Sequence, residues 1–145
     1  MTFSMLNKED VDKIVELFKA NFLDGWNKNM LLSAFDGGRF LSIGAFVEDK
    51  LVGAITCSLS FDDADVEGVT VEKSLRRKGI GKALLEQAEK VIKEKGISAL
   101  LLEVRQSNLP AIALYEQAGF KQISVRKSYY PDGENAVVMK KEFTK

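Results

Sequence analysis

Histidine is absent from this chain of 145 residues. Its absence excludes the Ser-His-Asp and Cys-His arrangements of nucleophilic catalysis. With a single cysteine, it also leaves too few soft ligands for a zinc site, so we expect no metal. Any proton transfer that the protein performs must therefore use Asp, Glu, Tyr, Lys or water.

Cysteine and proline are scarce as well. Cys57 is the only cysteine and lies within an apolar run, so no disulfide can form inside the chain. We expect a buried, inert thiol there rather than a nucleophile. The chain has two prolines and shows no repeat, low-complexity segment or linker. Residues 1–145 are therefore predicted to form one globular domain.

The chain has no excess of either charge and no long apolar run. Lys and Arg together number 21, as do Asp and Glu, whereas a nonspecific nucleic-acid binder needs a basic excess. No apolar run approaches the roughly 18 residues of a membrane span, and the N-terminus carries no basic and apolar leader pattern. We expect a soluble cytoplasmic protein without nucleic-acid or membrane partners, as a monomer or weak homodimer.

Hydrophobic periodicity predicts an alternation of strands and helices. Strands are predicted where apolar residues run continuously, and helices where they recur every three or four positions. The predicted strands are 3–6, 40–47, 51–59, 66–71, 99–104, 122–130 and 136–140, and the predicted helices are 7–22, 27–35, 79–95 and 108–118. This order predicts an α/β fold, a mixed sheet with helices on both faces.

A basic glycine turn stands out, Arg76-Arg77-Lys78-Gly79-Ile80-Gly81-Lys82, between a β-branched run and a long amphipathic helix. Gly79 and Gly81 let backbone N–H groups converge without an obstructing Cβ atom. The helix that follows adds the positive end of its dipole. Strand, turn and helix N-terminus together predict a pyrophosphate site, and a merely solvated basic turn is the alternative.

Over nearly its whole length the chain resembles the GNAT N-acetyltransferases. Their acetyl-CoA loop has Gln or Arg, two variable residues, Gly, one variable residue and a small residue, which Arg76, Gly79 and Gly81 match. A second block, 102–108 with 111–120, and the segment 125–131 are similar to the RimI branch, bacterial enzymes that acetylate the N-terminal alanine of a ribosomal protein. The resemblance implies the GNAT fold, a mostly antiparallel sheet with one splayed parallel strand pair.

The resemblance also implies how acetyl-CoA would bind. The backbone of Val69, Thr70 and Val71 would pair with the pantetheine arm as an added strand would. Asn108 would reach the pantetheine, although Asn before Leu-Pro is also an ordinary helix N-cap. The pyrophosphate would be held by the loop Arg76, Arg77, Lys78, Gly79, Ile80, Gly81 and Lys82.

Glu103 matches the position of the RimI general base, and Tyr115 that of its general acid. A peptide α-amine has a pKa of roughly 8 and a lysine side chain one of roughly 10.4. Near pH 7.5 about a quarter of the former and about a thousandth of the latter is neutral, so an α-amine needs modest help from a base. The alternative for Glu103 is a strand-end carboxylate paired with Arg105 or another cation. For Tyr115 it is a half-buried aromatic on a helix face.

Trp26, Tyr129 and Tyr130 are predicted to contact the acceptor, since RimI-type sequences keep a Trp and paired tyrosines that line the acceptor groove. The alternative for Trp26 is ordinary packing. Tyr129 and Tyr130 are consecutive on a predicted strand, so their side chains should point to opposite faces and one should be exposed. The alternative for both tyrosines is aromatic cover on an edge strand.

Glu67 is a rival or second base, on the strand that would meet the cofactor. RimI-type sequences carry apolar and amide residues at Glu67 and Gly68, so this chain departs from them there. Glu67 also ends an acidic cluster with Asp62, Asp63 and Asp65. The cluster is expected in a hairpin loop, where it is either solvated or attracts a basic peptide or polyamine.

These residues predict direct acetyl transfer from acetyl-CoA to an amine. No acyl-enzyme is expected, because Cys57 lacks a basic helper. A protein N-terminal α-amine is the preferred acceptor. The alternatives are a small amine or aminoglycoside-like acceptor, and a non-catalytic domain that binds acyl-CoA as a sensor.

Overall fold

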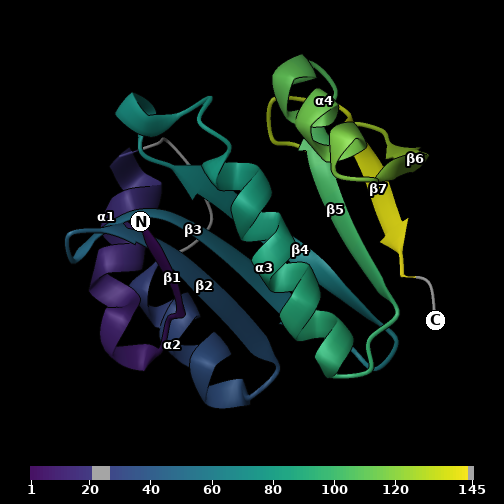
Figure 1. The fold of residues 1–145 in the computed structure, drawn as a ribbon. Coiled ribbons are helices and arrows are strands. Elements are labelled where there is room, and N and C mark those ends of the chain that lie inside the picture. Colours follow the sequence, from purple (N-terminus) through teal and green to yellow (C-terminus); the bar gives the residue numbers. More distant parts are fainter. Residues whose placement is uncertain (21–26, 144–145) are drawn as a thin grey trace.

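The computed structural model describes residues 1–20 and 27–143, which form one seven-stranded sheet flanked by helices (Figure 1). The spatial order is β1-β2-β3-β4-β5-β7-β6, and only β4 and β5 pair in parallel. The strands are β1 (Thr2–Met5), β2 (Phe40–Val47), β3 (Lys50–Leu59), β4 (Asp63–Val71), β5 (Ala99–Arg105), β6 (Lys121–Arg126) and β7 (Ala136–Glu142). The predicted mostly antiparallel sheet with one parallel pair is confirmed.

Helices cover both faces of the sheet, as predicted. Successive strand residues point to opposite faces, and on β3 Ala54 packs with α1 and α2 whereas Ile55 packs with α3. The core therefore has one apolar layer on each side of the sheet. The helices are α1 (Val11–Ala20), α2 (Lys28–Gly37), α3 (Ile80–Glu94) and α4 (Leu109–Gln117), with 3-10 turns η1 (Lys8–Asp10) and η2 (Lys73–Leu75). Within residues 1–20 and 27–143, no helix has the length and apolar character to cross a membrane.

The first helical segment begins differently from its prediction. Asn7 caps it as expected, because its side chain accepts the Glu9 N–H at 3.0 Å while Asp10 accepts the Asn7 N–H at 2.9 Å. The Asp10 N–H bonds to the Asn7 carbonyl at 2.9 Å, the spacing of a 3-10 turn. The first turn is therefore η1, and α1 begins only at Val11. The predicted extension to Phe22 lies outside the described residues.

Helix α3 agrees with its prediction to within one residue at each end. Its buried side chains form a single stripe, Ile80, Leu84, Leu85, Ala88 and Ile92. The stripe packs against β2, β3 and β4. Gly96, with φ 80°, follows the helix and lets the chain turn into β5.

Two strand predictions are wrong at one end. β4 begins at Asp63 rather than at residue 66, so most of the acidic cluster lies in a strand instead of a hairpin loop. β6 ends at Arg126 rather than continuing to Tyr130. Ser128 has φ 51°, and its N–H is held by the Asn135 side chain at 2.9 Å, which breaks the extended run.

Candidate active site

The parallel strands β4 and β5 separate along their length. They pair through four residue pairs, from Asp63 with Ala99 to Val66 with Leu102, although β4 continues to Val71 and β5 to Arg105. Beyond Val66, no described strand pairs with the edge of β4 that faces β5. The splayed pair expected from the resemblance is therefore present. The backbone around Val69, Thr70 and Val71 therefore has no described strand beside it on this edge, although the Val71 carbonyl accepts a hydrogen bond from Arg76.

The N-terminus of α3 follows β4 in the chain and leaves backbone N–H groups without a side-chain cap. Gly79 (φ 82°) precedes the helix, and no side chain caps its first turn. The N–H groups of Ile80, Gly81 and Lys82 have no acceptor within the helix, since the first intrahelical bond reaches back from Ala83 to Gly79. The Ile80 side chain is 5% exposed, so only its backbone can contact a ligand.

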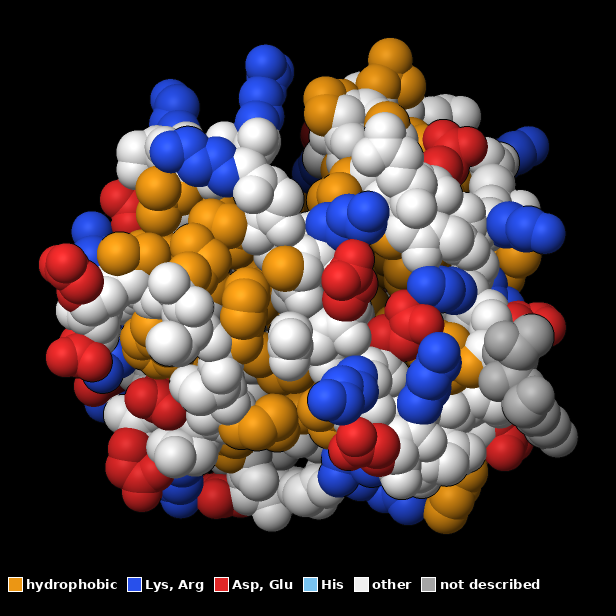
Figure 2. All heavy atoms as spheres, viewed as in Figure 1, with side chains coloured by type: hydrophobic (Ala, Val, Ile, Leu, Met, Phe, Trp, Pro, Cys, Tyr) orange, Lys and Arg blue, Asp and Glu red, His pale blue; other side chains and the backbone are white. Residues whose placement is uncertain are grey.

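Cations surround this helix end. Arg76, Arg77, Lys78 and Lys82 are all exposed. The Arg76 Nε donates to the Val71 carbonyl at 3.1 Å and ties the loop to the end of β4. Figure 2 shows Lys and Arg side chains projecting from the surface over the segment between β4 and α3, across a notch from α4. The predicted phosphate-binding residues are thus brought together.

Helix α4 packs beside this helix end. A Cβ atom added to Gly81 would lie 3.6 Å from Leu114 Cδ2, an ordinary contact. The Asn108 side-chain oxygen caps α4 by accepting the Ala111 N–H at 3.2 Å. The predicted capping role of Asn108 is therefore confirmed, and its amide nitrogen is the atom that a ligand contact would use.

Tyr115 is half-buried on α4. Its ring packs edge-on against Phe120, with centroids 5.9 Å apart. Burial and, secondarily, the nearby Tyr130 raise the pKa of Tyr115 to about 12. The phenol therefore stays protonated across the physiological range and can donate a hydrogen bond or a proton.

Glu103 lies on the part of β5 that follows the splay, with 31% of its side chain exposed. Its partner is not Arg105 but Arg126, whose Nε lies 3.0 Å from Glu103 Oε2. The Tyr129 hydroxyl donates to Glu103 Oε1 across 3.4 Å, a long hydrogen bond. Glu103 thus combines a cation partner, as in the alternative, with contact to a predicted acceptor residue.

Arg126 was missed by reasoning from the sequence. It lies on β6, and two strand pairings, β5 with β7 and β7 with β6, bring it to Glu103. No local pattern around residue 103 reports such a contact. The available signal was the presence of Arg126 in the family-like segment 125–131.

Glu67 is the extra residue of a β-bulge. On β3, Thr56 pairs with Gly68 and Cys57 pairs with Val66, so Glu67 has no partner. The bulge lies one residue past the last β4–β5 pair, at the start of the splay. Burial raises the pKa of Glu67, and the carboxylates of Asp65 and Glu103 add to the rise while a hydrogen bond with Ser58 opposes it.

The carboxylates of Asp65 and Glu67 on β4 lie close enough to Glu103 for their charges to interact. Burial, then the carboxylates of Asp63 and Glu103, raise the pKa of Asp65, and the Arg126 guanidinium lowers it. This end of the sheet therefore carries several carboxylates and one guanidinium. The excess of negative charge favours a cationic ligand.

The prediction that Tyr129 and Tyr130 point to opposite faces of a strand is wrong. They lie beyond the end of β6, and their rings meet edge-to-face with centroids 5.1 Å apart. Tyr129 is exposed, as one of the pair was expected to be, and Tyr130 is half-buried. The predicted Trp26 lies outside the described residues.

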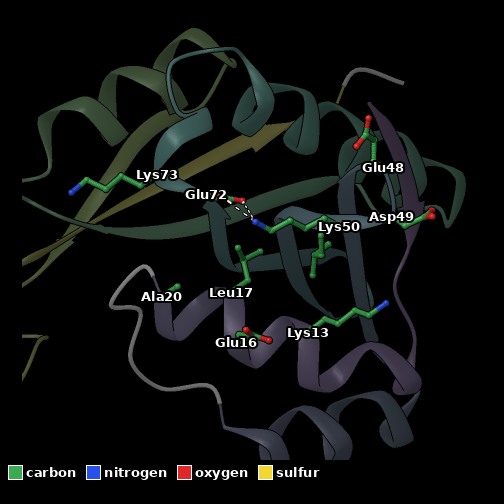
Figure 3. A pocket seen from close by; sticks show the side chains of 10 residues that line it. Lys13, Glu16, Leu17, Ala20, Glu48, Asp49, Lys50, Glu72 and Lys73 are labelled. Carbon is green, nitrogen blue, oxygen red and sulfur yellow. Dashed lines mark hydrogen bonds and ion pairs between the residues drawn. The ribbon is translucent and has the colours of Figure 1, made fainter.

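Two further features do not join this site. Cys57 is fully buried, as predicted, and burial followed by the charges of Glu67 and Asp65 raises the pKa of its thiol to about 12, which disfavours the thiolate. A cavity of about 650 Å³ lies between α1, the β2–β3 turn and the segment after β4 (Figure 3). Among the described residues, none of the predicted site residues lines this cavity. Its Lys50 and Glu72 are already paired at 3.3 Å.

Comparison with known proteins supplies independent information. The profile described as the acetyltransferase (GNAT) family matches residues 11–120. A [ribosomal protein bS18]-alanine N-acetyltransferase of Haemophilus ducreyi is 36% identical over 136 residues, which cover 91% of this chain and 93% of that protein. The protein of the same name from Escherichia coli is 32% identical over 141 residues, 95% of each chain.

Solved structures agree. The crystal structure of the Escherichia coli ribosomal-protein-alanine N-acetyltransferase superimposes with a TM-score of 0.91 at 31% identity, covering 99% of this chain and 94% of that chain. An aminoglycoside 6'-N-acetyltransferase shares the fold at a TM-score of 0.83 but only 18% identity, over 100% and 98% of the two chains. By profile, sequence and structure alike, the chain belongs to the acetyltransferase (GNAT) family.

Proposed function

We propose that this protein transfers the acetyl group of acetyl-CoA to the N-terminal α-amine of a protein, with the alanine of a ribosomal protein as the leading acceptor. The observation that carries the proposal is the full-length similarity to two proteins named for that activity, at 36% and 32% identity. The resemblance to aminoglycoside enzymes extends to the fold alone.

The donor site fits acetyl-CoA. The amides at the start of α3 and the exposed cations beside them suit a diphosphate, because such helix ends bind anions. The free edge of β4 suits an extended amide-containing arm, which Val69, Thr70 and Val71 would hold. Asn108 would contact the same arm. When bound, acetyl-CoA supplies an acetyl thioester.

Glu103 is proposed as the base that removes a proton from the acceptor ammonium, directly or through a water molecule. It is part-exposed at the splay, so a bound amine and solvent can both reach it. Glu67, at the bulge one residue past the last β4–β5 pair, is proposed to support it by adding negative charge. Tyr129, Tyr130 and Trp26 are proposed to line the groove that holds the acceptor.

Tyr115 is proposed to protonate the departing thiolate. A free thiol has a pKa near 8.5 and a free phenol one near 10, so this proton transfer would run uphill in water. Burial raises the pKa of Tyr115 to about 12, and a thiolate that loses solvation in the same dry site has its own pKa raised for the same reason, which keeps the transfer feasible.

A panel of acceptors tests the proposal by thiol release. One peptide would carry the N-terminal sequence of bS18, beginning with alanine, and a matched peptide would have the same sequence with a blocked α-amine. Spermidine and an aminoglycoside complete the panel. We expect release with the free peptide only, and mass spectrometry should place the acetyl group on its α-nitrogen. Equal rates with the blocked peptide, or turnover of the small amines alone, would exclude the proposed acceptor.

A further inference from the structure

Arg105, the last residue of β5, binds the loop that joins β6 to β7. Its Nη1 donates to Asp132 at 2.8 Å and to Glu134 at 3.0 Å, and both carboxylates belong to that loop. Glu134 in turn accepts the Ser107 N–H at 2.8 Å. In Figure 1 the loop lies beside α4, at the end of β5 from which Arg105 projects.

The loop also has hydrogen bonds of its own, from the Tyr130 N–H to the Glu134 carbonyl at 3.1 Å and from the Gly133 N–H to the Tyr130 carbonyl at 2.8 Å. Ser128 is in the left-handed region with φ 51°, and this end of the molecule is largely exposed. A second set of contacts, from Asn135 to Gln106 and to the Ser128 N–H, fixes the base of the loop. On the side of the loop that carries the tyrosines, Arg105 contacts Tyr130, and the guanidinium carbon of Arg126 lies 5.7 Å from the centroid of the Tyr129 ring.

A chain of contacts leads from Arg105 to Glu103. The guanidinium carbon lies 4.1 Å from the centroid of the Tyr130 ring, a stacking contact. The Tyr130 ring meets Tyr129 edge-to-face, and the Tyr129 hydroxyl donates to Glu103. Arg105 and Glu103 are two apart on β5 and therefore share a face of the sheet.

We propose that Arg105 is a positioning residue for acetyl transfer, which holds Tyr130 and Tyr129 as the wall of the acceptor groove and keeps the Tyr129 hydroxyl on Glu103. This inference rests on the proposed function, which supplies the peptide acceptor, and it adds Arg105 to the residues that bind that acceptor. Arginine suits the role because one planar group binds two carboxylates and stacks on a ring at the same time. A lysine would keep the charge and lose the stacking.

Steady-state kinetics with both substrates tests the proposal. Arg105→Ala is expected to raise the KM for the acceptor peptide about tenfold and to leave the KM for acetyl-CoA within about twofold, and Arg105→Lys should recover only part of the loss. The matched control is Arg39→Ala, which removes another stacked arginine, 4.4 Å over Phe61, and should change neither KM. Equal increases in the two KM values, or full rescue by lysine, would overturn the role.

A double-mutant cycle gives a readout that a merely structural role would not move. Tyr129→Phe removes the hydroxyl that donates to Glu103, and Arg105→Ala removes the group that is proposed to hold it there. Each change should lower kcat/KM for the acceptor peptide, and the double variant should lose little more than Arg105→Ala alone, because both changes act through the same contact. A loss equal to the product of the two single losses would contradict the chain of contacts.

Hydrogen exchange separates this inference from the proposed function. Without any substrate, Arg105→Ala should speed exchange at the amides of Tyr130 and Gly133 severalfold, and Arg39→Ala should not. Unchanged exchange would overturn the positioning role even if the peptide is acetylated. A wild-type protein that acetylates no peptide would instead refute the proposed acceptor. Should Arg105→Ala fail to fold, Glu134→Gln removes one partner of the same guanidinium and is expected to give the same pattern at smaller size.

Discussion

Glu103 and Tyr115 differ most in their access to water. Glu103 has part of its side chain exposed and a guanidinium at 3.0 Å, whereas Tyr115 is shielded enough to raise its pKa to about 12. A base that exchanges protons with solvent needs the first environment. An acid that must protonate a poorly solvated sulfur needs the second. The two residues therefore suit different halves of the reaction.

Tyr115→Phe should lower kcat by about 100-fold while the KM for acetyl-CoA changes by less than about twofold. In the proposed mechanism the hydroxyl acts only when the thiolate leaves, so its removal slows the chemical step and does not weaken the binding of acetyl-CoA. Steady-state rates of thiol release at saturating peptide give both constants. An unchanged kcat would remove Tyr115 from the mechanism.

Glu103→Gln should lower kcat/KM by about 100-fold, and Glu67→Gln by no more than about fivefold. Rates of thiol release between pH 5.5 and 9 would compare the two variants, in the range spanned by a carboxylate base and an α-amine acceptor. A larger loss from Glu67→Gln would reverse the roles, and flat results in both would indicate that bulk water is the base.

Helix α3 joins the core to the proposed donor site. Ile80 is anchored in the core, so the first turn of the helix has a fixed position, while the amides beside it remain without a side-chain cap. Gly79 takes the left-handed conformation that a larger residue adopts only with strain. Apolar packing thereby holds polar groups ready for a ligand before the ligand arrives.

Arg76→Ala should raise the KM for acetyl-CoA about three- to tenfold at low ionic strength and by less at high salt. The guanidinium is exposed, so mobile ions screen its attraction for phosphate. Lys90→Ala, on the exposed side of the same helix, is the matched control and should leave the KM unchanged at either salt concentration. A larger effect at high salt than at low salt would exclude an electrostatic role.

Across the whole molecule, one ion pair links α3 to β7. Lys141 Nζ lies 2.7 Å from Glu89 Oε2, and Lys93 lies 3.1 Å from the other oxygen. Burial alone would raise the pKa of Glu89, but hydrogen bonds from Lys141 and Lys93 outweigh it and lower the pKa. The pair joins the helix beside the donor site to the half of the sheet that carries Glu103.

Glu89→Gln should lower Tm by about 2–4 °C near neutral pH and leave the KM values unchanged. A carboxyl whose pKa is lower in the folded state stabilises the fold above its unfolded pKa, roughly 4.3, and this stabilisation is lost as the pH falls through the folded value. The difference in Tm between variant and wild type should therefore shrink below about pH 4.5. Thermal unfolding monitored by circular dichroism from pH 3 to 8 checks this, and a difference independent of pH would contradict the assignment.

Periodicity and capping signals predicted the four α-helices and seven strands of the described residues, because burial of apolar faces dictates both, but they did not predict the 3-10 turn η2. They failed where a contact depends on strands distant in sequence. The bulge at Glu67 is set by the register with β3, and the end of β6 by the Asn135 side chain. Glu103 was placed on the right strand, but its partner Arg126 is reached only through the order of three strands.

The seam of four residue pairs between β4 and β5 has a thermodynamic consequence. A coenzyme arm lying along this edge would act as an additional strand and would bind only the folded protein. Coenzyme binding and folding are therefore thermodynamically linked. At a coenzyme concentration 100 times its Kd, the native state gains about 2.7 kcal/mol. Resistance to proteolysis should then follow the supply of coenzyme, and the protein would persist longest where its donor is plentiful.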